Sequence, residues 1–126
     1  TPQKLAVADA RKGADMFRNP QVGIPLLGIV ENMAYFVPDD APDKRYFLFG
    51  EGGGATLAAE LGVPLLAQIP LRQGISENAD DGRPAAVYKD GVLGMAFHEL
   101  SQSLARQVAI RNSNLPPSAK VSVSLT

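Results

Sequence analysis

One short apolar run, residues 24–33 (IPLLGIVENM), constrains the fold of this chain more than any other stretch. The run is rich in branched apolar residues, shows no polar alternation and is too short for a typical helix. Such a run is typical of a strand that is buried on both faces of a parallel sheet. We therefore expect an α/β fold in which residues 24–33 form an inner strand.

The apolar run closes on Glu31 and Asn32, which places an amide at the expected carboxyl end of the strand. In open α/β sheets, ligands bind off the carboxyl ends of the strands. An amide can donate and accept a hydrogen bond at the same time, as reading the edge of a nucleotide base requires. Asn32 also fits a plain cap or turn, and the run by itself leaves both interpretations open.

Composition excludes several classes of function. A chain of 126 residues with 45% apolar and 20% charged residues is typical of one globular domain. The formal net charge of -1 gives no general attraction for nucleic acid or for a membrane. The absence of cysteine excludes thiolate metal sites, and the single histidine, His98, excludes a metal site made of several histidines in one chain. With no membrane-length apolar run and no signal peptide, we expect a cytoplasmic protein.

The first residues predict a helix from about Pro2 to Phe17, with Thr1 as its N-cap and Asn19-Pro20 ending it. A helix followed by a buried strand is half of a βαβ unit, and the strand that should precede the helix is absent. We therefore expect that the chain is cut from a longer one.

Two aromatic runs, residues 35–37 and 46–49, flank a polar loop that contains prolines. They predict a β-excursion at about residues 34–50, which projects from the ligand end of the sheet. Its aromatic side chains form either a small satellite core or a contact surface.

The glycine-rich run Gly50–Ala55 fits a relaxed G-x-G-x-x-A pattern between a strand and a helix. The acidic residue that a dinucleotide site requires after the next strand is missing, because that strand ends in Gln68-Ile69-Pro70. No Lys-Ser/Thr pair follows the glycines, so a phosphate-binding loop is also excluded. We interpret the run as the flexible start of a helix.

The remaining pattern predicts a helix over residues 55–61 that stops at Gly62, a buried strand over 63–69 that stops at Pro70, and a short helix from Ser76 to Gly82. Adjacent Asp80 and Asp81 point in different directions on a helix, so no metal site is expected there. A long helix, capped by Asp90, should cover residues 91–111. Its expected core stripe is Leu93, Phe97, Leu100, Leu104 and Val108, and His98 beside it is expected to be partly buried and structural. The tail, residues 112–126, is either disordered or an added edge strand.

Taken together, these segments resemble the Mrp branch of the MinD/ParA-like P-loop ATPases. The resemblance rests on six blocks, TPQ at 1–3, GIVENMAYF at 28–36, FGEGG at 49–53, LGVPLL at 61–66, IPL at 69–71 and GRP at 82–84. It covers about Thr1 to Leu104 in the correct order. It implies that residues 1–111 form the C-terminal part of a P-loop NTPase-like parallel sheet flanked by helices.

The resemblance also implies a function. Members of this family bind ATP with Mg²⁺, act as homodimers and carry iron–sulfur clusters to apo-protein targets. It implies that Asn32 contacts the adenine base and that Pro70 and Leu71 wall it. The phosphate loop with its lysines and the aspartates that coordinate Mg²⁺ lie further N-terminal in the family. We therefore expect no catalytic residue and no metal ligand in this chain, and only weak ATP binding by the chain alone.

Typical family members carry Cys-x-x-Cys in the excursion, where this chain reads VPDDAP at residues 37–42. Iron–sulfur clusters require thiolate ligands, so cluster binding by the usual residues is not expected. Two other functions fit the pattern, a stand-alone interaction module without nucleotide chemistry and a partition or positioning ATPase of the wider group. Because two parallel strands make no stable sheet alone, we also expect the chain to pair with a second copy or to expose an apolar face.

Overall fold

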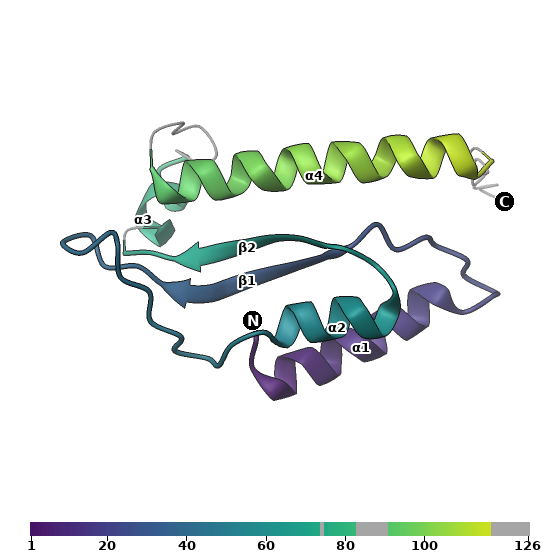
Figure 1. The fold of residues 1–126 in the computed structure, drawn as a ribbon, viewed down its shortest axis with the longest axis horizontal. Helices are drawn as coiled ribbons and strands as arrows, with labels where there is room; N and C mark the ends of the chain where they lie inside the picture. The colour runs from purple at the N-terminus through teal and green to yellow at the C-terminus, as the bar shows by residue number, and fades with distance from the viewer. Residues whose placement is uncertain (74, 83–90, 117–126) are drawn as a thin grey trace, which may run out of the picture.

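The computed structural model describes residues 1–73, 75–82 and 91–116. The elements are α1 (Lys4–Arg18), β1 (Ile29–Phe36), α2 (Gly53–Leu61), β2 (Leu65–Leu71), α3 (Ile75–Asp80) and α4 (Val92–Asn114). β1 and β2 pair in parallel, with α1 and α2 along one side of the sheet and α4 along the other (Figure 1). The expected α/β class, a parallel sheet flanked by helices, is confirmed.

The start of β1 differs from the prediction, because the strand begins at Ile29 and not at Ile24. A side-chain carbon at Gly28 would lie 2.7 Å from the Pro64 carbonyl oxygen, so the segments that lead into β1 and β2 are already in close contact at this glycine. The ladder starts one residue later, where the Ile29 N–H donates to that carbonyl at 2.9 Å. The predicted burial on both faces is also wrong, since Val30 is 40% exposed. Among the described residues, β1 has β2 as its one neighbouring strand.

The end of β1 lies beyond Asn32, which the sequence placed at the carboxyl end of the strand. Asn32 pairs with Ile69, and the register is then irregular until Phe36 pairs with Leu71. Met33 has a φ of 52° at the start of this irregularity. Asn32 is therefore the last residue of the regular ladder rather than the last residue of the strand.

Pro70 lies within β2 and does not end it, which corrects the predicted strand end. The carbonyl of Leu71 accepts a hydrogen bond from the Val37 N–H at 3.1 Å, so the backbone polar groups of Leu71 point toward β1. Backbone groups of successive strand residues point to opposite edges, so the nitrogen of Pro70 faces the edge away from β1. A proline is tolerated there because no ladder hydrogen bond is required of it.

The excursion after β1 is held by isolated bridges and not by the expected β-strands. Phe36 and Tyr46 form an antiparallel bridge at its base. The Arg45 guanidinium lies 4.5 Å from the centre of the Tyr35 ring, and Phe47 meets the same ring edge-on at 6.2 Å. Tyr46 and Phe47 are nevertheless 46% and 44% exposed, so the excursion has a small aromatic cluster and also presents aromatic surface.

The first helix begins at Lys4 and not at Pro2, with Gln3 rather than Thr1 as its N-cap. Pro2 is buried against Gly53 at the start of α2, which leaves no room for a side chain at that glycine. The chain is extended at Gln3, with a ψ of 134°, because it has to leave this contact before the helix can start. The helix ends as predicted, with Asn19 as its C-cap.

The other helix boundaries are close to those predicted. α2 ends at Gly62, whose φ of 67° is the left-handed conformation expected of a glycine stop. α3 begins at Ile75, so Ser76 lies inside the helix and is not its cap. α4 runs to Asn114 instead of Arg111, which removes residues 112–114 from the predicted tail. The predicted cap Asp90 and residues 117–126 of the tail lie outside the described residues.

Two clusters of buried side chains hold the layers together. On one side of the sheet, Leu57 and Leu61 of α2 pack with Ala14 of α1. On the other side, Ala67 and Ile69 of β2 pack against α4. The α4 residues of this second cluster are Ala96, Leu93, Phe97 and Leu100.

The predicted core stripe of α4 is wrong at its last members, because Leu104 and Val108 are 40% and 39% exposed. The 23 residues of α4 extend over about 34 Å, whereas the 7 residues of β2 extend over about 23 Å. The helix therefore continues past the strand that it covers, as Figure 1 shows.

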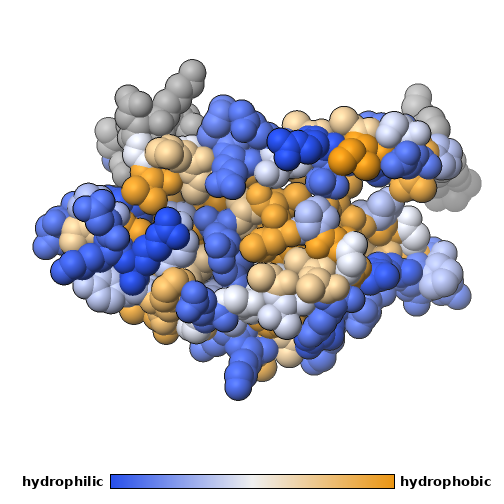
Figure 2. Space-filling model, in the orientation of Figure 1, coloured by the Kyte–Doolittle hydropathy of each residue, from blue (hydrophilic) through white to orange (hydrophobic). Residues whose placement is uncertain are grey.

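Apolar surface gathers in the middle of the molecule, between α4 and the pair of α1 and α2 (Figure 2). Leu5, Met95 and Leu48, which are 73%, 68% and 58% exposed, add apolar side chains elsewhere on the surface. This agrees with the expectation that the chain by itself exposes an apolar face. In the part of the chain that the structure describes, no helix is both long enough and apolar enough to cross a membrane.

Replacing Leu57 by alanine should lower the free energy of unfolding by about 2–5 kcal/mol, because the side chain is only 2% exposed and its loss leaves a cavity. The control is Leu5→Ala at a side chain that is 73% exposed, which should change it by no more than about 0.5 kcal/mol. Urea unfolding of the two variants measures the difference. Equal values would contradict the assignment of the core.

Candidate functional site

Asn32 is the first of the three residues that the sequence assigned to a base site. Its side chain is exposed. Its amide oxygen accepts a hydrogen bond from the Met33 N–H at 2.9 Å, within the irregular part of β1. Among residues 1–73, 75–82 and 91–116, its amide nitrogen has no hydrogen-bond partner.

Pro70 and Leu71 lie on the neighbouring strand, directly after the residue opposite Asn32. Ile69 packs against Ala96 of α4, and side chains alternate along a strand, so Asn32 and Leu71 lie on the α4 face of the sheet. Pro70 lies on the other face and is fully buried. The structure thus brings Asn32 and the partly exposed Leu71 to one face, whereas the ring of Pro70 belongs to the interior.

An ion pair ties the excursion to the chain segment that follows β2. The guanidinium of Arg72, next to Leu71, lies 2.5 Å from the Asp39 carboxylate. The Arg72 side chain is 19% exposed and that of Asp39 is 58% exposed, so solvent screens the pair and its energy is small. The contact serves mainly to orient the excursion beside the end of the sheet where Asn32 and Leu71 lie.

Glu31 is a site residue that the sequence analysis did not assign. It is only 3% exposed, and it precedes Asn32 on β1. One carboxylate oxygen accepts a hydrogen bond from the Gly54 N–H at 2.5 Å, and the other accepts one from the Gln68 side-chain amide at 2.8 Å. The signal in the sequence was a carboxylate inside an apolar run, since a glutamate is almost never fully buried without a partner.

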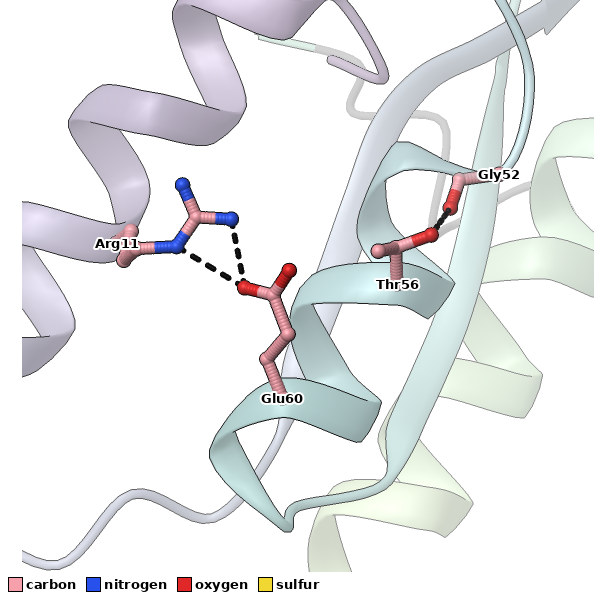
Figure 3. Close-up of polar contacts among 4 residues, drawn as sticks. All are labelled: Arg11, Gly52, Thr56 and Glu60. Carbon is pink, nitrogen blue, oxygen red and sulfur yellow. Dashed lines mark hydrogen bonds and ion pairs between the residues drawn. The ribbon is translucent and has the colours of Figure 1, made fainter.

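The Glu31 carboxylate also decides the role of the glycine-rich run. It lies at the start of α2, where free N–H groups and the helix dipole favour an anion. Gly52 turns the chain into the helix with a φ of 75°, and the Thr56 hydroxyl donates to the Gly52 carbonyl at 3.0 Å (Figure 3). Because a protein carboxylate already occupies this position, the run is the start of a helix, as predicted, and not a phosphate site.

Arg11 and Glu60 join α1 to α2 on the outside of the same layer. The Arg11 guanidinium donates to one Glu60 oxygen at 2.6 Å and 3.0 Å (Figure 3). Arg11 therefore lies on the side of α1 that faces α2. The two side chains are 42% and 45% exposed, so solvent screens the pair and it adds little to the stability of the contact between the two helices.

His98 is exposed, which corrects the expectation of a partly buried histidine. Its Nε2 lies 3.0 Å from the side-chain nitrogen of Gln102, one turn along α4. It lines a hollow of about 430 Å³ together with Tyr35 and Arg45. The described residues contain no group of three or more histidine, aspartate or glutamate side chains that could hold a metal ion.

Comparison with known proteins identifies relatives over most of the chain. Residues 1–109 match the family model of ParA proteins described as NUBPL iron-transfer P-loop NTPase. The chain is 43% identical over 111 residues to an iron–sulfur cluster carrier protein of Synechocystis, covering 87% of this chain and 31% of the relative. It is 41% identical over 120 residues to a protein of the same name in Deinococcus radiodurans, covering 92% and 32%.

A eukaryotic relative shows the same coverage. The chain is 38% identical over 107 residues to an Arabidopsis thaliana protein named iron–sulfur protein required for NADH dehydrogenase, mitochondrial, covering 84% of this chain and 33% of the relative. The chain thus spans about a third of the length of the curated relatives that it matches.

Replacing Gly54 by alanine should destabilise the protein by about 1–3 kcal/mol, because the added carbon would lie 2.8 Å from both the Glu31 Cβ and its carboxylate oxygen. The control is Gly13→Ala in α1, where nothing lies within 4 Å and better helix propensity should stabilise by about 0.5–1 kcal/mol. Thermal unfolding should move in opposite directions in the two variants. A stabilising Gly54→Ala would contradict the close packing of Glu31.

Proposed function

The chain belongs to the ParA-type family of NUBPL iron-transfer P-loop NTPases, and from this membership we propose that it is the base-binding part of an ATPase that carries iron–sulfur clusters. The observation that carries the proposal is the position of Asn32 at the end of the regular ladder. Its exposed amide has a donor without a partner among the described residues, and Leu71 lies on the same face of the sheet as an apolar wall. An amide beside an apolar side chain suits the edge and the face of an adenine base.

The phosphate groups of ATP find no matching site in the described residues. The start of α2 would attract an anion, but the Glu31 carboxylate occupies it and would repel a phosphate. In our proposal, the polypeptide outside residues 1–126 binds the phosphates and Mg²⁺, and residues 1–126 recognise the base. Pro70 contributes by shaping the backbone between Ile69 and Leu71, since its ring is buried.

The iron–sulfur cluster is the cargo in this proposal, and residues 1–126 supply no usual ligand for it. The sequence contains no cysteine, and iron–sulfur clusters are held by thiolates. The cluster would therefore bind to residues outside this chain or be held between the protein and its apo-protein target. Homodimer formation and a cytoplasmic location remain predictions from the sequence.

A second candidate function is an interaction module without nucleotide chemistry. It is favoured by the aromatic surface of the excursion, where Tyr46 and Phe47 are 46% and 44% exposed. Exposed aromatic side chains on an ordered loop are typical of protein contact sites. A protein that contains residues 1–126 and binds no ATP would favour this function over the first.

The isolated chain of residues 1–126 should bind a fluorescent ATP analogue only weakly and without saturation, because the phosphates have no cradle of N–H groups and no lysine. Titration followed by fluorescence anisotropy measures this binding, with the full-length protein as the positive control. Tight, saturable binding by the isolated chain would contradict the proposed division of the site.

In the full-length protein, Asn32→Ala should weaken ATP binding by about two- to tenfold, since the base loses a hydrogen bond worth about 0.5–1.5 kcal/mol. The preference for ATP over CTP should fall, whereas binding of inorganic tripolyphosphate should not change. Isothermal titration calorimetry measures the three affinities. Asn114→Ala, at an exposed asparagine at the end of α4, is the matched control. An unchanged preference for ATP would contradict the assignment of Asn32.

A further inference from the structure

The buried carboxylate of Glu31 is more than a packing feature of the fold. We infer that Glu31 is a positioning residue that fixes the direction of Asn32, and that it connects the base-binding strand to the excursion through the start of α2. The inference rests on the proposed base contact of Asn32.

The first argument is the geometry of adjacent residues on β1. Glu31 faces α2, where it bonds to Gly54, and side chains alternate along a strand, so Asn32 faces the opposite side. Both carboxylate oxygens of Glu31 are engaged, one by α2 and one by Gln68 of β2. A rotation of β1 about its own axis would break both bonds. The direction of the Asn32 side chain is therefore set by the contacts of Glu31.

The second argument is the place of these contacts along the ladder. Glu31 pairs with Gln68 and Asn32 pairs with Ile69, and the register becomes irregular immediately afterwards. Met33, the next residue, has left-handed backbone geometry. The regular ladder thus orients Asn32 from the N-terminal side alone. After Asn32 the backbone ladder no longer fixes the rotation of β1, and the two hydrogen bonds of the Glu31 side chain fix it instead.

The third argument is the lack of free space between Glu31 and α2. A side-chain carbon at Gly54 would lie 2.8 Å from the Glu31 Cβ, so α2 approaches β1 too closely for any side chain at this position. The hydrogen bond from the Gly54 N–H prevents the helix from moving away. The described residues place no cation beside this buried carboxylate, which is stabilised instead by the two hydrogen bonds and by the start of α2.

The same contact fixes the excursion. The excursion leaves the sheet at the end of β1 and returns to it at the start of α2. Its near end is held by Phe36 and Tyr46, which exchange backbone hydrogen bonds of 2.8 Å and 2.9 Å. Its far end is held by Glu31 through Gly54. The strand that presents Asn32 to a base therefore also carries two anchors of the aromatic surface, in addition to the Arg72–Asp39 ion pair.

The test uses the full-length protein with substitutions at Glu31. In Glu31→Ala, the ratio of ATP to CTP affinity should fall by about two- to tenfold, as expected when a base hydrogen bond loses its geometry, while tripolyphosphate affinity stays unchanged. Glu31→Gln should keep the ratio. The amide oxygen of the substituted side chain can accept from the Gly54 N–H, and its NH₂ group can donate to the Gln68 side-chain oxygen once the Gln68 amide has turned over. Glu51→Ala is the control, because Glu51 is an exposed carboxylate in the same glycine-rich turn.

Asn32→Ala, measured in parallel, separates this inference from the proposed function. If Asn32→Ala loses the preference for ATP and Glu31→Ala keeps it, the positioning role is overturned and the base site stands. If Asn32→Ala also keeps the preference, the base site itself fails, and the inference fails with it. Should Glu31→Ala not fold, Gln68→Ala removes only one of the two bonds and should lower the ratio by a smaller factor. An unchanged ratio in Gln68→Ala would then overturn the positioning role.

Discussion

The carboxylate of Glu31 binds the start of α2 with one oxygen and the Gln68 side chain with the other, and the layering of the molecule depends on these bonds. They join the two strands to each other and to the helix that covers β1. Burying a charge is costly unless every lone pair finds a donor, so the arrangement tolerates little movement around this residue. Gly54 is required at the point of closest approach, because any side chain there would displace the carboxylate.

In the proposed function, the Glu31 carboxylate lies between two parts of a nucleotide site. Recognition of a base needs a directed amide and an apolar wall, for which we propose Asn32 and Leu71 on one face of the sheet. Recognition of phosphates needs free N–H groups and positive charge, and the one glycine-rich helix start among the described elements is already occupied by Glu31. A chain that spans about a third of its curated relatives is consistent with this division of the site.

The exposed apolar side chains follow from the small size of the sheet. The two parallel strands offer little area for the helices to cover, and α4 continues beyond β2, so Leu104 and Val108 have no strand of the described residues beneath them. Parallel sheets in proteins are normally covered on both faces. The apolar surface between α4 and the α1–α2 pair is the part of this side of the molecule that the described elements leave uncovered (Figure 2).

The sequence by itself determined the α/β class, the order of the elements and the helix ends at Asn19 and Gly62. These features depend on local signals, such as a glycine that adopts a positive φ or a proline that cannot continue a helix. It also predicted that Asn32 ends one buried strand and that Pro70 and Leu71 follow another, whereas the structure places Pro70 and Leu71 within β2. Only the tertiary structure decided the strand limits, the inclusion of Pro70 in β2 and the role of Glu31. Each of these features depends on which strand or helix packs against a given edge or face of the sheet. That strand or helix is formed by residues far away in the sequence, as in the pairing of β1 with β2 and the contact of Glu31 with Gly54.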